Sequence, residues 1–305
     1  MPSLKRAFKY FHSNHSQFLD STVKNLGFLF PDKLYLSLRY RFQMGKWIDW
    51  INPKLFTEKI QWLKVYGFKP EYSMMVDKYA VKDYVAGLLG EQYIIPTLGV
   101  WDKPEEIDWD SLPDKFVLKT TNGGGGTGVV ICQNKSILDK NEAIKKLSYH
   151  NAVTSDGKEF REHQYYNVKQ RIIAEQLIPS PNGDLTDYKF YCFNGKPEYC
   201  QVIRDRRIKE TIDFYDMDWN LMPFVGLNPK CENGLQAMAK PKCLDEMIMM
   251  CQTLSKDIPF CRIDLYNVDD RPLFGEITFY PASGFGRFKP TEWDEKLGSM
   301  IKLPQ

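Results

Sequence analysis

The sequence has 305 residues, of which 43% are hydrophobic, 14% aromatic and 26% charged, a composition ordinary for a globular protein and unlike that of a disordered one. No run of about 18 apolar residues occurs, which excludes a typical transmembrane helix, and the N-terminus lacks the apolar segment of a secretory signal. We therefore expect residence in the cytoplasm. The 7 Cys residues form no CxxC pair and the 4 His residues no HExxH motif, so we expect reduced thiols and no zinc site.

The formal net charge of +2 hides a local excess of positive charge. Residues 1–46 hold eight of the 41 Lys and Arg residues but two of the 39 Asp and Glu residues. This basic, aromatic-rich segment indicates either contact with anionic lipid or a lipid-linked glycan at the inner face of the membrane, or a solvated helix face that packs its Phe and Tyr on the main domain. The remaining sequence is slightly acidic and has no groove-reading motif, so nucleic acid is not an expected partner.

The first third of the sequence predicts helices. Residues 33–46 have a helical pattern, and Asn52-Pro53 breaks the chain before a second helix with an apolar stripe at helical spacing over residues 56–65. A third helix is predicted over residues 72–89, ended by Gly90.

From about residue 112 the pattern changes to short runs of β-type residues. The predicted strands are 116–119, 129–132, 172–178, 187–193, 198–203, 260–266 and 273–279. Asn194-Gly195 predicts a tight hairpin, residues 242–254 a helix, and residues 267–272 a second hairpin turn. Antiparallel hairpins combined with helices predict an α+β fold rather than a repeating βαβ series.

A glycine-rich loop follows the predicted strand that ends at Lys119. Its residues are Gly123, Gly124, Gly125, Gly126, Thr127 and Gly128. Without Cβ atoms, backbone N–H groups can crowd around an anion, so the loop is either a phosphate cradle or a flexible surface turn. The Walker pattern is absent. The neighbouring Lys119 favours the cradle, because a cation beside such a loop is the expected partner of a triphosphate.

Two carboxylates lie on the last pair of predicted strands. Arg262 and Asp264 share one strand face, as do Glu276 and Thr278 on the next strand. If the turn centres on Asp270, then Asp264 lies opposite Glu276, since each is six residues away. Facing carboxylates repel unless a cation lies between them, and Mg²⁺ takes such oxygen ligands. The alternative is that Arg262 neutralises them as a structural ion pair.

A third group of polar residues lies on two neighbouring predicted strands. Glu175 lies within the apolar run 172–178, where it is either a cap or edge residue or a group that recognises the base or ribose of a nucleotide. Asp187 and Lys189 share one face of the next predicted strand.

Taken in order, these segments resemble the TupA-like ATP-grasp family of polysaccharide-associated amidoligases. The segments that carry the resemblance are 52–63, 76–81, 95–101, 116–119, 171–176, 187–190, 275–279 and 283–286. The resemblance implies an α+β, ATP-grasp fold in which two α+β subdomains grip ATP, after a basic helical N-terminal extension. The implied parts are the extension at 1–50, a substrate-side subdomain at 51–111, a lid subdomain at 112–178, and a C-terminal subdomain with the metal site at 179–305.

The resemblance also implies which residues bind the nucleotide. Lys78 and Lys119 would hold the ATP phosphates, the loop 123–128 would form the lid loop, and Asp187 would receive the ribose. The adenine slot would be lined by Glu175, Gln176, Leu177 and Ile178.

For the metal and the reaction, the resemblance implies a second set of roles. Asp264 and Glu276 would bind Mg²⁺, with Thr278 or a water in the place where many family members have a metal-binding Asn. Arg262 would lie over the transferring γ-phosphoryl group, and Lys189 is the second candidate catalytic residue.

The implied function is an ADP-forming ligase. Phosphoryl transfer from ATP would turn a carboxylate into an acylphosphate, which an amine then attacks. The family implies a sugar acid or glycan carboxylate and an amino acid or amine, joined in surface polysaccharide or capsule biosynthesis. Alternatives are a phosphotransferase on the same fold, a glycosyltransferase with Asp216-Met-Asp218 as its metal motif, and a nucleotide-binding module without catalysis.

Overall fold

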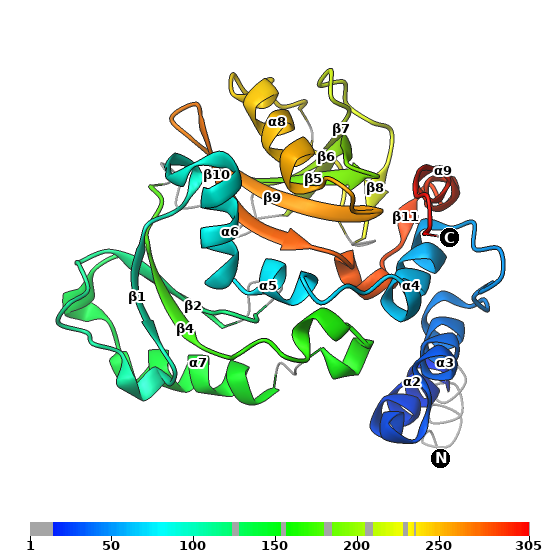
Figure 1. Cartoon of the computed structure of the whole chain (residues 1–305), viewed down its shortest axis with the longest axis horizontal. Helices are drawn as coiled ribbons and strands as arrows, with labels where there is room; N and C mark the ends of the chain where they lie inside the picture. Colours follow the sequence, from blue (N-terminus) through cyan, green and yellow to red (C-terminus); the bar gives the residue numbers. More distant parts are fainter. Residues whose placement is uncertain are drawn as a thin grey trace, which may run out of the picture.

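The computed structural model describes residues 15–123, 128–153, 157–179, 185–204, 210–227, 231–234 and 236–304, without the side chains of residues 149–153. Two antiparallel β-sheets with helices around them form an α+β architecture, with the N-terminal helices at one end (Figure 1). The predicted fold class is therefore confirmed.

The smaller sheet has four strands in the order β1-β4-β2-β3. The strands are β1 (Thr97–Trp101), β2 (Phe116–Thr120), β3 (Val129–Cys132) and β4 (Ile172–Gln176). Helix α7 (Lys140–Val153) lies along one face of this sheet and contacts β2 and β3 (Figure 1). The residues buried between them include Phe116, Leu118, Leu147, Ile172 and Ala174, so this sheet has a core of its own.

The larger sheet has five strands in the order β10-β9-β5-β6-β7. The strands are β5 (Asp187–Phe193), β6 (Lys196–Arg204), β7 (Thr211–Tyr215), β9 (Phe260–Val268) and β10 (Arg271–Thr278). Helix α8 (Leu244–Leu254) packs on one face of this sheet. Helices α5 (Tyr72–Val76) and α6 (Ala80–Leu89) lie between the two sheets (Figure 1).

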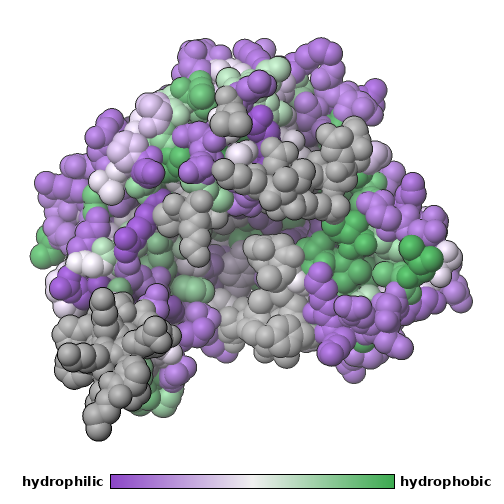
Figure 2. Space-filling model, turned by 180° about the vertical axis from the view of Figure 1, so that it is seen from behind, coloured by the Kyte–Doolittle hydropathy of each residue, from purple (hydrophilic) through white to green (hydrophobic). Residues whose placement is uncertain are grey.

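The remaining elements surround the larger sheet and connect the two sheets. They are α2 (His15–Asn25), α3 (Asp32–Met44), α4 (Phe56–Tyr66), α9 (Glu292–Met300), and the two-stranded pair β8 (Val225–Gly226) and β11 (Phe288–Lys289). Short 3-10 helices lie at Gly27–Leu29, Glu91–Tyr93, Pro104–Glu106, Lys135–Ile137, Lys158–Phe160, His163–Tyr165 and Pro281–Gly284. From behind, the surface is hollowed near its middle (Figure 2).

The large core forms where α4 meets the larger sheet. Phe56 is fully buried and packs edge-on against Phe260, with 4.9 Å between ring centroids, as the predicted apolar stripe requires. All seven cysteines are free, and six of them are buried as small core side chains. Both predictions from the sequence are confirmed.

The predicted strands lie within one or two residues of the observed ones, and both hairpins are present. Asn194 and Gly195 have φ of 50° and 82°, as a two-residue turn requires. In the second hairpin the turn is Asp269-Asp270, because Val268 pairs with Arg271.

The predicted pairing of Asp264 with Glu276 is confirmed, although the reasoning behind it was wrong. Counted from the observed turn, Asp264 would face Gly275. A β-bulge between Phe274 and Glu276 adds one residue to β10 and brings Glu276 opposite Asp264 instead. The bulge therefore decides which side chain faces the carboxylate of Asp264.

The predicted helix over residues 72–89 was wrong, because the chain breaks between α5 and α6. Asp77 accepts hydrogen bonds from the backbone N–H groups of Tyr79 and Ala80, at 2.9 and 3.2 Å, and so starts a new helix. Its other carboxylate oxygen accepts from Arg171 at 2.7 Å. The backbone N–H of Lys78 donates to the carbonyl of Thr121 at 3.0 Å instead of continuing a helix. The sequence pattern also missed α2, α7, α9, β1 and β7.

The helices α2 and α3 form a pair with a small core of Val23, Tyr35, Leu36, Tyr40 and Ile48. The hydroxyl of Tyr35 donates to the carbonyl of Glu159 at 2.7 Å, so part of this aromatic-rich segment packs on the main body, as one alternative predicted. Phe18 and Phe28 are 60% and 81% exposed. Within the described ranges, no helix combines the length and apolar character needed to cross a membrane.

The packing also suggests how the chain divides. Because β1 pairs with β4, we propose that the lid subdomain begins near Thr97 rather than at residue 112. The other predicted boundaries, at residues 50 and 178, stay predictions.

We predict that Gly275→Ala destabilises the protein by about 1–3 kcal/mol, the usual cost of overpacking. A Cβ at Gly275 would lie 2.9 Å from the carbonyl oxygen of Asp264 and 3.1 Å from the ring of Tyr266. Urea unfolding measures the change. Gly87→Ala is the matched control, because no atom lies within 4 Å of its added Cβ and helix α6 gains a better helix former. Equal stability of the two variants would contradict the close packing of Asp264 and Tyr266 around Gly275 at the bulge.

Candidate functional site

Charged side chains line one face of the larger sheet. Strand alternation puts Asp187 and Lys189 of β5 on the same face as Arg262 and Asp264 of β9. Asp264 is the Cα partner of Lys189 on one side and of Glu276 on the other. Cations and carboxylates of three neighbouring strands therefore share one face of the sheet.

Arg262 joins the oxygen atoms at the centre of this row. Its Nε and Nη2 donate to the two carboxylate oxygens of Asp264 at 2.6 and 2.8 Å. The same Nη2 lies 3.4 Å from Glu276 Oε1 and 3.2 Å from Thr278 Oγ1. The oxygens of all three predicted metal ligands thus converge on one point, which the guanidinium occupies here.

Two lysines complete the row. Lys189 Nζ forms a close ion pair with Asp264 Oδ2 and lies 4.0 Å from Asp187 Oδ1. Lys78 Nζ lies 2.9 Å from Glu276 Oε2. The row thus contains three cations and three carboxylates: Lys78, Lys189 and Arg262 with Asp187, Asp264 and Glu276.

The pairing controls the protonation of these groups. Burial lowers the pKa of Arg262, but its attraction to Asp264, its hydrogen bonds with Asp264 and the nearby Glu276 together outweigh burial and hold that pKa above its ordinary value. Burial raises the pKa of Glu276, but Lys78, Lys189 and Arg262 outweigh it and hold that pKa below 4.5. The structural ion pair that the sequence offered as an alternative is therefore present.

The same oxygen atoms suit a divalent cation. Mg²⁺ binds through one or two carboxylates, with phosphate and water oxygens completing its octahedron. Asp264 and Glu276 supply the carboxylates and Thr278 a hydroxyl. Across the part of the chain that the structure describes, no cluster of three or more His, Cys, Asp or Glu could hold a metal ion by itself. The donor set fits a metal that a phosphate ligand helps to hold.

Lys78 connects the glycine-rich loop to this row. The break between α5 and α6 brings it there, and its Nζ donates to the carbonyl of Gly123 at 2.6 Å. Gly128 has φ of 67°, and its carbonyl accepts from the backbone N–H of Thr120 at 3.3 Å. The other predicted loop residues, Gly124, Gly125, Gly126 and Thr127, lie outside the described residues.

A family model described as TupA-like ATPgrasp matches residues 58–302, well over half of the chain. The chain belongs to the TupA-like ATP-grasp family. This confirms the resemblance, and with it the prediction of an ATP-grasp enzyme. No curated protein matches the sequence.

Solved ATP-grasp structures are similar to this chain at low identity. D-alanine–D-alanine ligase from Bacillus anthracis is 17% identical over 72% of this chain and 64% of its own, with a TM-score of 0.41. The Helicobacter pylori ligase is 14% identical over 82% and 68%, with a TM-score of 0.42. The RimK domain protein from Sphaerobacter thermophilus is 10% identical over 75% and 69%, with a TM-score of 0.40. Likenesses of this strength do not identify a function, and this chain spans less than two thirds of the Bacillus anthracis ligase.

In this ATP-grasp chain, Glu175 pairs with two lysines, and its predicted role in recognising the base or ribose of a nucleotide stays a prediction. Strand β4 lies between β1 and β2, so Glu175 is not an edge residue. Its two carboxylate oxygens are held by Lys82 at 2.5 Å and Lys119 at 2.6 Å. Burial raises the pKa of Glu175, but the two lysines outweigh it and hold that pKa below 4.5.

The remaining predicted adenine residues follow Glu175 along the chain. Gln176 is exposed, and Leu177 and Ile178 are half-buried just beyond the end of β4. Their predicted role in the adenine slot stays a prediction.

Sequence reasoning missed two residues of this ATP-grasp site. Tyr266 shares its strand face with Arg262 and Asp264 and lies close enough to Asp187, Glu276 and Asp264 for their charges, after burial, to raise its pKa. Strand alternation would have identified it. Lys82 follows Lys78 by four residues, and only the folded chain shows that Glu175 is its partner.

We predict that Asp264→Asn lowers the free energy of unfolding by about 3 kcal/mol in the absence of nucleotide, because it leaves two buried cations less compensated. Asp264 is 2% exposed and pairs with both Arg262 and Lys189. Chemical unfolding measures the change. Asp270→Asn, in the turn of the same hairpin, removes an exposed pair with Lys242 and is expected to change stability little. Similar losses in both variants would contradict the assignment of a buried charge row.

A second prediction concerns pH. Because the pKa of Glu276 is lower in the folded than in the unfolded state, its contribution to stability is present above about pH 4.5 and is lost as the pH falls below that value. We expect the wild type to lose stability between about pH 5 and pH 3 more steeply than Glu276→Gln. Glu292→Gln, which removes an exposed partner of Lys296, serves as the control and should keep the wild-type slope.

Proposed function

We propose that this chain is an ATP-dependent carboxylate–amine ligase that releases ADP and phosphate through an acylphosphate. The observation that carries the proposal is the position of Lys78, whose ammonium group bonds both Gly123 of the glycine-rich loop and Glu276 of the carboxylate pair. A phosphate cradle and a candidate metal site therefore meet at one side chain.

In this proposal, ATP binds between the two sheets. Lys78 and Lys119 hold its phosphates, together with backbone N–H groups of the loop from Gly123 to Gly128. The residues from Gln176 to Ile178 line the adenine slot, and Asp187 receives the ribose. The family assignment supports these roles, and so does the placement of Lys78 and Asp187 at the row of charges.

Asp264, Glu276 and Thr278 would hold Mg²⁺, which supplies positive charge to the phosphate oxygens. Arg262 is bound to both of these carboxylates, and Lys189 is bound to Asp264. If Mg²⁺ were bound by these oxygens, the guanidinium of Arg262 and the ammonium of Lys189 would be available to the γ-phosphoryl group and the substrate carboxylate. Two candidate catalytic cations would thus be held beside two acidic residues until they are needed.

The reaction balances in two steps. A carboxylate oxygen of the substrate attacks the γ-phosphorus, the bond to the β-phosphate oxygen breaks, and ADP leaves. A neutral amine then attacks the acyl carbon, phosphate leaves with the bonding electrons, and the amine loses a proton. Positioning and charge neutralisation by Lys78, Lys119 and Arg262 are the contributions of the chain.

For the substrates, we propose a sugar acid or glycan carboxylate and an amino acid or amine, joined in surface polysaccharide or capsule biosynthesis. The resemblance to the family supports this choice. We further propose that the N-terminal extension contacts a lipid-linked glycan or the inner face of the membrane from the cytoplasm. The exposed Phe18 and Phe28, which lie on either side of Lys24 in the sequence, support that contact.

Two other functions make different predictions. A phosphotransferase would leave phosphate on its acceptor, which phosphorus-31 NMR of the product detects. A glycosyltransferase would use Asp216 and Asp218 for a metal. Asp216 instead accepts hydrogen bonds from the backbone N–H groups of Asp218 and Asn220 at 3.1 and 2.7 Å, as in an ordinary turn.

We expect Mg-ATP to raise the melting temperature, and turnover with substrate to release ADP and phosphate. Lys119→Ala should weaken ATP binding by about tenfold or more, because it removes a charge-assisted phosphate contact. Isothermal titration measures affinity, and screening uronic acids against amines for ADP release tests activity. Lys145→Ala, at an exposed lysine of α7, is the control. AMP and pyrophosphate as products, or unchanged ATP affinity in Lys119→Ala, would overturn the proposal.

A further inference from the structure

A buried carboxylate in the smaller sheet is shared by two lysines from different elements. Lys119 of β2 binds Glu175 Oε2 at 2.6 Å, and Lys82 of α6 binds Glu175 Oε1 at 2.5 Å. The side chains of Lys82 and Glu175 are 10% and 7% exposed, and that of Lys119 is 20% exposed. One carboxylate therefore has two cationic partners, of which Lys119 is the more accessible.

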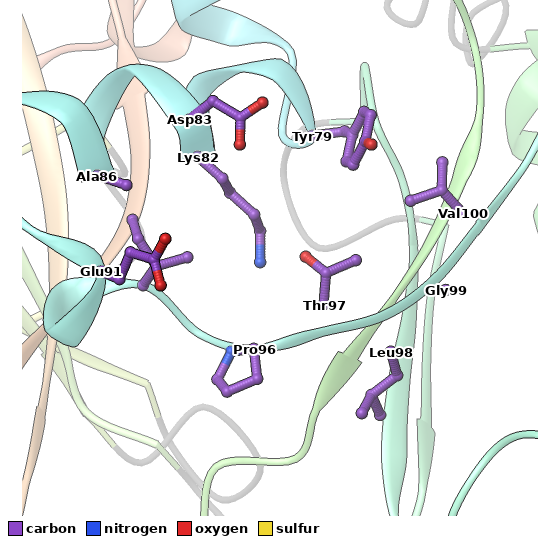
Figure 3. A pocket seen from close by; sticks show the side chains of 11 residues that line it. Tyr79, Lys82, Asp83, Ala86, Glu91, Pro96, Thr97, Leu98, Gly99 and Val100 are labelled. Carbon is purple, nitrogen blue, oxygen red and sulfur yellow. The ribbon is translucent and has the colours of Figure 1, made fainter.

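Lys82 reaches this position independently of the proposed ATP site. Its side chain extends from α6 toward Pro96 and Thr97 (Figure 3), and its Nζ also donates to the carbonyl of Ile95 at 2.6 Å. It lines a pocket of about 500 Å³ between α6 and the start of β1. Neither Lys78 nor Lys119 is among the residues that line this pocket. Lys82 is thus anchored next to the start of β1, away from Lys78 and Lys119, and can stay there when a nucleotide binds.

The second lysine matters because of what ATP binding would require of Lys119. Its ammonium would have to turn from Glu175 to a phosphate oxygen. If Lys119 were the sole partner of Glu175, this movement would leave a carboxylate of 5% exposure without a counterion, which costs several kcal/mol of desolvation and lost pairing. With Lys82 in place, Glu175 keeps one ion pair while Lys119 moves to the phosphate.

We propose that Lys82 is a positioning residue that acts as the permanent counterion of Glu175, so that Lys119 can transfer its ammonium from Glu175 to a nucleotide phosphate. The proposal rests on the nucleotide site proposed above and deepens it. It assigns Glu175 to holding Lys119 before ATP binds rather than to recognising the base.

The proposal predicts opposite effects for the two partners of one salt bridge. Lys82→Met leaves Glu175 with Lys119 alone, which should weaken ATP binding by about tenfold or more, since Lys119 is held more tightly. Glu175→Gln removes the competing carboxylate, so it should keep or tighten ATP binding while lowering the melting temperature of the empty protein. Lys82→Arg keeps the charge and should bind ATP within about threefold of the wild type.

The double variant Lys82→Met/Glu175→Gln decides between positioning and a purely structural role. With no carboxylate to hold Lys119, ATP affinity should return to within about threefold of the wild type. A structural ion pair predicts instead that the second substitution weakens binding further or leaves it as weak. Lys59→Met is the matched control, because Lys59 also donates to a backbone carbonyl, that of Ile301 at 2.7 Å, but on α4. It should bind ATP as the wild type does.

Titration calorimetry gives the affinities, and thermal unfolding without nucleotide gives the stabilities. The proposal is overturned if Lys82→Met binds ATP normally, or if the double variant binds no better than Lys82→Met. If Lys82→Met alone does not fold, the double variant and Lys82→Arg still decide, since weak binding by either one contradicts the proposal. If the wild type does not bind ATP, the proposed nucleotide site is wrong. If the wild type binds ATP but the variants do not behave as predicted, only the role of Lys82 is wrong.

Discussion

The structure around the site depends on one constraint, which is that every carboxylate buried between the two sheets needs a cation within ion-pair distance. Asp264 has Arg262 and Lys189, and Glu175 has Lys82 and Lys119. Buried ion pairs add little to stability, because desolvation offsets most of their attraction, but breaking one is costly. Such pairs are therefore suited to exchange, in which a metal or a phosphate replaces one partner without leaving the other unpaired.

The same constraint ties the two sheets together through the short helices between them. At the break between α5 and α6, Lys78 bonds Gly123 on one side and Glu276 on the other, while Asp77 binds Arg171 just before β4. Four residues after Lys78, Lys82 of α6 reaches Glu175 within the smaller sheet. One helical connection thus supplies cations to carboxylates of both sheets.

Helices α2 and α3 contact the main body, although both precede the residues that the family model matches. Arg39 binds Asp20 and the carbonyl of Glu159, and Arg161 donates to the carbonyl of Gly27 at 2.6 Å. These contacts hold the segment that follows α7. Burial lowers the pKa of the nearby Lys64 to about 7. The Nζ atom of Lys64 donates to the carbonyl of Ser283 at 2.7 Å. The extension is therefore a structural support of the region beside the site.

The sequence alone determined the features that depend on local periodicity. Runs of β-type residues identified the strands, strand alternation identified the common face of Arg262 and Asp264, and Asn194-Gly195 marked its hairpin. These features depend on side-chain direction and turn conformation, which neighbouring residues determine. Only the tertiary structure decided the helix break at Asp77, which a distant arginine stabilises, and the pairing of Glu175 with Lys82. A buried charge takes the opposite charge that folding brings closest in space, and no spacing along the chain records that distance.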